Sequence, residues 1–309
     1  MKKKLLILGT NGFLGKNLLS LLNKTKDNVF TIYELDGKKT TDLSEFNLVN
    51  KLFKKIKPNY VINSSAFVGG IAFGYKFPAS ILDKNLQMVL NIFRSSIENN
   101  IEMLINPISN CAYPGQLNEY KEELFWEGSP HESVFNYAMT RRIIVALGAA
   151  YYKEYNLNSS NIVLSNMYGP HDHFDVERSH ALGALIYKIH NAKITNKKTV
   201  EIWGTGKPVR EWLYAEDGAS ALIESINLGK GSHFYNIGVN KGISITNLAL
   251  KISKYLNWNG EFIYNTERPD GALEKRVDGN SFQNKLKWKP KFELDDGLKS
   301  TIDWYVKNF

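Results

Sequence analysis

A glycine-rich loop near the beginning of the chain constrains its fold more than any other feature. The apolar run 4–8 ends at Gly9, and Gly12 and Gly15 follow at steps of three residues. The apolar residues beyond the first glycine recur at the spacing of a helix: Phe13, Leu14, Leu18, Leu19 and Leu22. In the order strand, tight turn, helix, the backbone can approach a pyrophosphate at the positive end of the helix; a plain tight turn is the alternative interpretation. The loop therefore predicts a dinucleotide site formed by Gly9, Asn11, Gly12, Phe13, Leu14 and Gly15.

Strand-like and helix-like patterns then alternate over the first half of the chain. We expect strands at 4–8, 29–33, 60–63, 103–108 and 161–165, and helices at about 48–56, 81–96 and 136–155. Such alternation predicts an α/β protein with a doubly wound parallel sheet covered by helices on both faces. After residue 168 the rhythm breaks. We therefore expect a dinucleotide-binding core at 1–168, with later segments returning to it, and a smaller α/β substrate lobe formed mainly by 169–309.

Composition narrows the classes of protein further. The hydrophobic fraction of 43% and charged fraction of 23% are those of an ordinary soluble domain. The one cysteine cannot form an internal disulfide, and no run reaches the roughly 18 to 20 apolar residues of a membrane span, so we expect a cytoplasmic protein with no membrane partner. The net charge of +8 is spread along the chain, which favours anionic nucleotide ligands over nucleic acid.

One acidic residue bears on which dinucleotide is bound. Glu34 lies 19 residues beyond Gly15, at the end of the second predicted strand, where a carboxylate can bind the ribose 2′-hydroxyl and repel a 2′-phosphate. This favours NAD(H). Lys38 and Lys39 are close by and could instead bind the 2′-phosphate of NADP(H), and Glu34 could also be a solvated strand end. The choice of cofactor stays open.

A tyrosine and an arginine on the predicted helix 136–155 indicate a site of proton transfer. Tyr137 and Arg141 are four residues apart, so they share a helix face, and the cation there lowers the pKa of the phenol. The strand 103–108 runs into Ser109 and Cys111, and residues at the carboxyl end of a parallel strand face the ligand crevice. The spacing alone is common on surface helices, but this context favours a proton-transfer site.

These motifs carry a resemblance that runs almost from end to end. The chain resembles the extended short-chain dehydrogenases/reductases, and among them the GDP-L-fucose synthases, which act on GDP-4-keto-6-deoxy-mannose. The matching segments are 9–15, 66–71, 109–114, 137–138, 166–172, 179–180, 203–206, 210–211 and 269–271. The resemblance implies a Rossmann-type fold, a GDP-linked keto-sugar substrate, NADP(H) as the family's cofactor and no metal ion. It also implies a homodimer through the helices around 81–98 and 136–155.

The resemblance implies a role for each matching residue. Tyr137 would protonate the C4 oxygen as hydride arrives from nicotinamide, and Ser109 would hydrogen-bond that oxygen. Tyr137 and Arg141 would also bind the cofactor. Cys111 and His180 match the pair for 3,5-epimerisation, in which a thiolate removes a proton beside the ketone and an imidazolium returns one to the opposite face. The nucleotide would be bound by Asn166, Lys188, Trp203, Arg210 and Arg268. Without the resemblance we would interpret Cys111 as a small buried residue and His180 as a surface loop residue, and Trp203 equally well as a core indole.

Three departures from the family pattern leave questions open. Arg141 replaces a lysine, and a guanidinium can stabilise the phenolate but cannot relay a proton. Asn11 and Glu34 stand where NADPH-using members tend to have arginines. Phe67 and Asn110 replace polar residues near the sugar, so the sugar could be a hexose or a heptose. The alternatives to a 4-ketoreductase are an epimerase without reduction and a nucleotide-binding protein without catalysis.

Overall fold

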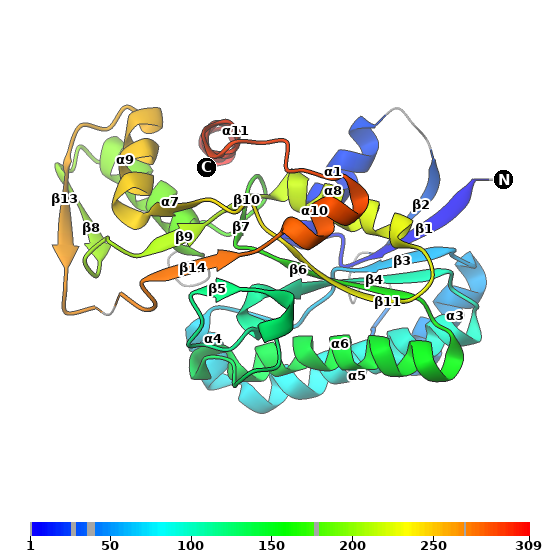
Figure 1. Ribbon diagram of the computed structural model, residues 1–309. Helices are drawn as coiled ribbons and strands as arrows, with labels where there is room; N and C mark the ends of the chain where they lie inside the picture. Colours follow the sequence, from blue (N-terminus) through cyan, green and yellow to red (C-terminus); the bar gives the residue numbers. More distant parts are fainter. Residues whose placement is uncertain (1, 26–28, 36–40, 176–178, 269) are drawn as a thin grey trace.

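A parallel six-stranded sheet forms the centre of the larger part of the protein (Figure 1). The computed structural model describes residues 2–25, 29–35, 41–175, 179–268 and 270–309, so Lys38, Lys39 and Pro269 lie outside the described residues. In sheet order the strands are β11 (Ser232–Ile237), β6 (Ser159–Leu164), β4 (Met103–Ser109), β3 (Tyr60–Asn63), β1 (Lys3–Leu8) and β2 (Phe30–Leu35). Every neighbouring pair is parallel. The predicted doubly wound sheet is confirmed.

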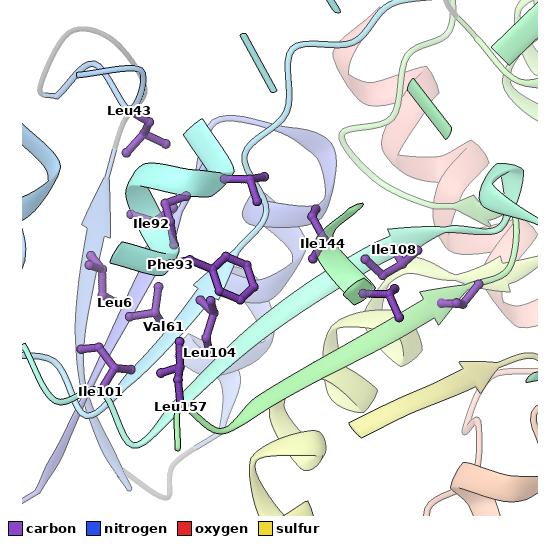
Figure 2. Close-up of a cluster of buried hydrophobic side chains, with 14 of the residues drawn as sticks. Leu6, Leu43, Val61, Ile92, Phe93, Ile101, Leu104, Ile108, Ile144 and Leu157 are labelled. Atoms are coloured by element: carbon purple, nitrogen blue, oxygen red, sulfur yellow. The ribbon is translucent and has the colours of Figure 1, made fainter. Parts of the chain in front are cut away.

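Helices cover both faces of this sheet because the side chains of each strand alternate between them. Leu6 and Leu8 of β1 face one layer, and Leu5 and Ile7 face the other. The first layer contains α3 (Phe46–Ile56), α5 (Pro78–Glu98) and α6 (Phe135–Tyr155); the second contains α1 (Phe13–Lys24), α8 (Ala215–Glu224) and α10 (Asn280–Leu286). Figure 2 shows the first layer, where Phe93 packs over Val61 and Leu104, and Ile144 lies beside Ile108.

A smaller lobe has its own apolar core. It contains α7 (Ala181–Ile194), α9 (Ile245–Leu256), α11 (Leu294–Asn308) and the parallel pair β8 (Thr199–Trp203) and β13 (Glu261–Asn265). A second parallel pair, β7 (Met167–Tyr168) and β10 (Leu213–Tyr214), lies between this lobe and the main sheet (Figure 1). Segments beyond residue 168 do return to the large sheet, as α8, β11 and α10, while the boundary at 168 stays a prediction.

A four-stranded sheet joins the two parts of the protein. Its order is β12 (Gly242–Ser244), β9 (Val209–Glu211), β14 (Glu274–Val277) and β5 (Glu119–Tyr120), where β5 belongs to the connection that follows β4. The buried carboxylate of Glu211 accepts backbone N–H bonds from Val277 at 2.6 Å, Asn240 at 3.0 Å and Val239. Burial raises the pKa of Glu211 to about 7, and these three donors oppose the rise. The carboxylate thereby fixes strands that come from distant parts of the chain.

The remaining short helix, α4 (Ile71–Lys76), follows the loop after β3. Over the described residues, the structure contains no helix that is both long enough and apolar enough to cross a membrane.

Candidate active site

The glycine loop lies where the order of the strands reverses. Along the chain, β2 follows β1 on one side, and β3 then pairs with the other side of β1, so the loop after β1 is at the switch point where sheets of this kind bind ligands. The helix α1 begins at Phe13, and its N-cap residue Gly12 provides no side-chain acceptor. The first N–H groups of α1 are therefore available to an anion, as the sequence predicts.

Two glycines of this loop are required by close backbone approaches. Gly9 has φ +80°, and a Cβ there would lie 2.8 Å from the backbone of Ser64 in the loop after β3. A Cβ on Gly15 would overlap the carbonyl oxygen of Gly9 and lie 2.6 Å from the Cα of Thr10. A side chain at Gly9 would push the turn away from the loop after β3, and one at Gly15 would push α1 away from the turn, which explains both glycines independently of any ligand.

Glu34 lies beside the glycine loop with its side chain exposed. It belongs to β2, which ends at Leu35, two residues later than predicted, and it pairs in register with Ile7. The hydroxyl of Thr10 donates to the carbonyl oxygen of Leu35 at 3.0 Å, which fixes the loop against the end of β2. Glu34 thus stands exposed on the strand that the loop contacts, and its role at the ribose stays a prediction. The two lysines that compete with it in the sequence lie outside the described residues.

Tyr137 and Arg141 meet on α6 as their spacing predicts. The guanidinium carbon lies 4.9 Å from the centroid of the phenol ring. Arg141 is only 2% exposed; its Nη2 donates to Asn85 Oδ1 at 3.2 Å and its Nε to Thr140 Oγ1 at 3.4 Å. Burial raises the pKa of Tyr137, the charge of Arg141 lowers it, and a charge on Cys111 raises it. The guanidinium thus stabilises a phenolate that burial disfavours.

Asn85 belongs to this group, and sequence reasoning missed it. The side chain is fully buried on α5, donates to the carbonyl oxygen of Phe67 at 2.8 Å and accepts from the N–H of Phe67 at 3.0 Å. It therefore connects the loop after β3 to Arg141 on α6. No local pattern distinguishes Asn85 from other polar residues on an amphipathic helix, so only the three-dimensional contact identifies it.

The turn after β4 brings a serine and the cysteine next to this pair. Ser109 ends β4, and its Oγ accepts the backbone N–H of Cys111 at 3.4 Å within the short 3₁₀ turn Asn110–Ala112. Arg142 of α6 donates to the carbonyl oxygen of Ala112 at 2.7 Å, which fastens the turn to the tyrosine helix. Cys111 as a residue is partly exposed, while its thiol is buried. Ser109, Cys111, Tyr137 and Arg141 form one group.

Several charges act on the Cys111 thiol. Burial raises its pKa, whereas the hydrogen bond with Ser109 and the positive charges of Arg141 and Lys275 lower it. A thiolate is the reactive form, so the balance between burial and these cations sets its availability as a base.

The structure does not join His180 to this group. His180 is the exposed N-cap residue of α7, and within the described part of the chain it makes no hydrogen bond or ion pair with Cys111 or Tyr137. Although the residue as a whole is exposed, burial of its imidazole and the charge of the neighbouring His173 lower the pKa of that imidazole. The expected pairing of Cys111 with His180 stays a prediction.

Three of the residues expected at the nucleotide form a cluster on the smaller lobe. Trp203 is 52% exposed, which excludes its interpretation as a core indole. The Nζ of Lys188 lies 5.1 Å from the centroid of the indole ring, and the guanidinium carbon of Arg268 lies 5.2 Å from it. An open aromatic surface with two cations suits a base and a diphosphate.

The other two residues expected at the nucleotide lie outside this cluster, Asn166 beside the Cys111 turn and Arg210 on the joining sheet. Asn166 accepts from the amide of Asn110 at 3.3 Å and donates to the carbonyl oxygen of Glu211 at 3.1 Å, so its side chain is already engaged within the protein. Arg210 is half-buried on β9, where burial lowers its pKa and charges on Tyr120 and Asp270 raise it.

The sheet, the glycine loop and the group around Tyr137 define an extended short-chain dehydrogenase/reductase. The chain belongs to the NAD dependent epimerase/dehydratase family, whose sequence model matches residues 5–238. It is therefore an oxidoreductase that uses a nicotinamide cofactor. The expected relationship to the GDP-L-fucose synthases is confirmed as well.

Three relatives illustrate the range of similar proteins. GDP-L-fucose synthase 1 of Arabidopsis thaliana is 31% identical over 306 residues, which cover 99% of this chain and 94% of that protein. GDP-L-colitose synthase of Yersinia pseudotuberculosis is 32% identical over 98% of both chains. The crystal structure of a GDP-D-glycero-L-gluco-heptose synthase from Campylobacter jejuni in the presence of NADPH superposes with a TM-score of 0.88, at 28% identity, over 99% of this chain and 98% of that one.

Proposed function

We propose that this protein reduces the C4 ketone of a GDP-linked 4-keto-6-deoxy sugar, a hexose or a heptose. The grouping of Tyr137, Arg141 and Ser109 at the carboxyl end of β4 carries the proposal, and the sugars named for the relatives support it. The bound cofactor supplies a hydride to C4. Tyr137 donates its proton to the C4 oxygen, Ser109 hydrogen-bonds that oxygen, and Arg141 stabilises the resulting phenolate.

The same site also supports epimerisation before reduction. In this step Cys111 removes the proton from the carbon beside the ketone, and His180 returns a proton to the opposite face of C3 or C5. The position of the thiol, two residues beyond Ser109 and within reach of the charge on Arg141, supports this assignment. On the smaller lobe, Trp203 with Lys188 and Arg268 would bind the guanine and diphosphate.

Turnover with defined keto sugars tests the proposal. GDP-4-keto-6-deoxy-mannose and a GDP-4-keto-heptose are each mixed with NADPH or NADH, and the absorbance of the reduced nicotinamide is followed. We expect at least one combination to consume cofactor. Solvent deuterium entering the sugar without cofactor turnover would instead indicate an epimerase alone. Tight cofactor binding with no reaction of any sugar nucleotide would indicate a binding protein.

Changing Arg141 tests how the site uses its guanidinium. Arg141→Met removes the charge that lowers the pKa of Tyr137, so we expect reduction to slow by about 10- to 100-fold and the pH profile of the reverse oxidation to move to higher pH. Arg141→Lys keeps the charge but cannot bond both Asn85 and Thr140 as the guanidinium does, so its activity should be equal to or lower than that of the natural enzyme. Higher reductase activity in Arg141→Lys would show that the arginine lowers the activity of the natural enzyme.

The exposed Glu34 supports a preference for NADH, whereas the NADPH present with the Campylobacter relative supports the phosphorylated cofactor. We propose that Glu34 sets the ratio between the two. Glu34→Gln removes a negative charge that repels a 2′-phosphate, so kcat/KM with NADPH relative to NADH should rise about tenfold. Glu45→Gln, at the exposed N-cap of α3, is the matched control. An unchanged ratio in Glu34→Gln would place the carboxylate away from the ribose.

The homodimer through the helices α5 and α6 stays a prediction.

A further inference from the structure

A lysine that sequence reasoning missed is brought to the Cys111 turn by the joining sheet. Lys275 lies on β14, between β9 and β5, and is the register partner of Arg210. Its Nζ lies 5.9 Å from the centroid of the Tyr120 ring, and the side chain is half-buried. Within the described part of the chain, no carboxylate forms a salt bridge with Lys275. The ammonium group of Lys275 is therefore half-buried on the strand next to Arg210, another cation.

An aromatic stack connects this lysine to the cysteine. The rings of Tyr120 and Tyr113 are stacked with their centroids 4.7 Å apart, and Tyr113 is two residues beyond Cys111. Tyr113 is itself fixed, because its hydroxyl donates to Asn236 Oδ1 at 2.8 Å and the residue is only 1% exposed. The stack fixes the end of the Cys111 turn against β5, which pairs directly with β14. The fold therefore links Lys275 to the Cys111 turn through the stacked rings of Tyr120 and Tyr113.

The charged and titratable groups around the thiol come from four elements. Arg141 and Tyr137 belong to α6, Tyr120 to β5, Lys275 to β14, and the hydroxyl of Ser109 to β4. Arg141 is already engaged, because it lies against the Tyr137 ring and bonds Asn85. Lys275 lies against the Tyr120 ring, but among the residues that the structure describes its side chain makes no hydrogen bond or salt bridge. Its pKa is lowered by burial and by Arg210 and raised by a charge on Cys111, so a thiolate is the counter-charge that the lysine lacks.

We propose that Lys275 supplies a positive charge that favours the thiolate form of Cys111, and so acts as a positioning residue for proton abstraction from the substrate. The inference rests on the proposed epimerisation. The sulfur lone pair forms the S–H bond while the electrons of the C–H bond move into the enolate, and no oxidant or reductant is consumed. Lys275 donates no proton in this step. Its charge opposes the effect of burial, which raises the pKa of Cys111.

The chain contains one cysteine, so its reactivity can be measured without background and without substrate. The rate of alkylation by iodoacetamide is measured against pH for the natural enzyme and for Lys275→Met, Lys275→Arg and Lys285→Met, the last at an exposed lysine on α10. We expect Lys275→Met to raise the thiol pKa and to slow alkylation at neutral pH by about 3- to 10-fold. Lys275→Arg should restore the profile, and Lys285→Met should match the natural enzyme. Lys275→Gln replaces Lys275→Met should the latter not fold.

An unchanged pH profile in folded Lys275→Met would overturn the inference, even where the enzyme reduces keto sugars normally. A loss of substrate affinity with an unchanged thiol profile would likewise overturn it and assign the lysine to substrate binding. A shifted profile supports the inference even where no keto sugar is turned over, and in that case only the proposed function fails. With an active enzyme, Lys275→Met should slow solvent-deuterium exchange at C3 and C5 more than it slows ketone reduction.

Discussion

Tyr137→Phe lowers the rate of ketone reduction by about 10²- to 10⁴-fold, because it removes the phenolic proton donor and leaves the ring and its contact with Arg141 in place. The measurement is single-turnover oxidation of the reduced nicotinamide with excess GDP-keto sugar. Cofactor affinity should change little, since the glycine loop belongs to another element.

Tyr152→Phe is the matched control, because Tyr152 lies exposed on the same helix. It should reduce the ketone at the natural rate. A Tyr137→Phe enzyme that also keeps the natural rate would show that the proton comes from another group.

Cys111→Ser abolishes exchange of solvent deuterium into C3 and C5, with an expected loss of about 10²- to 10⁴-fold, because a serine hydroxyl does not form an anion near neutral pH. Reduction of a ketone with the final stereochemistry already in place should continue, since Tyr137 and Ser109 remain. Burial raises the pKa of the thiol, so exchange by the natural enzyme should increase as the pH rises through that pKa. Mass spectrometry of the sugar nucleotide measures the exchange.

Alkylation of the natural enzyme provides a second route to the same result, since no other cysteine is present. The alkylated protein should lose exchange as Cys111→Ser does. Exchange that persists in both preparations would assign the base to another residue.

The sequence predicts the parallel sheet well, because its buried strands are apolar runs that end at glycine or polar residues. The predicted bounds of β6 are wrong at its start. That strand begins at Ser159, two residues before the predicted start, and its polar residues are buried. Asn161 accepts from Asn106 at 3.1 Å and donates to the carbonyl oxygen of His233 at 3.2 Å. Partners on neighbouring strands satisfy these amides, and local hydropathy does not reveal such partners.

In the candidate site, too, the sequence predicts local neighbours but not contacts between distant elements. Tyr137 and Arg141 share one helix and Ser109 and Cys111 one turn, so spacing and position predict each of these two local pairs. Asn85 and Lys275 come from α5 and β14, and their contacts with the site depend on tertiary packing.

The joining sheet also sets the order in which the site can assemble. Strand β5 comes from residues 119–120, but the strands that complete its sheet come from residues 209–211 and 274–277. Contacts between such distant segments form slowly, because a long stretch of chain must be ordered to close them. During synthesis, the Cys111 turn and β5 therefore leave the ribosome well before the strands β9 and β14 that fix them.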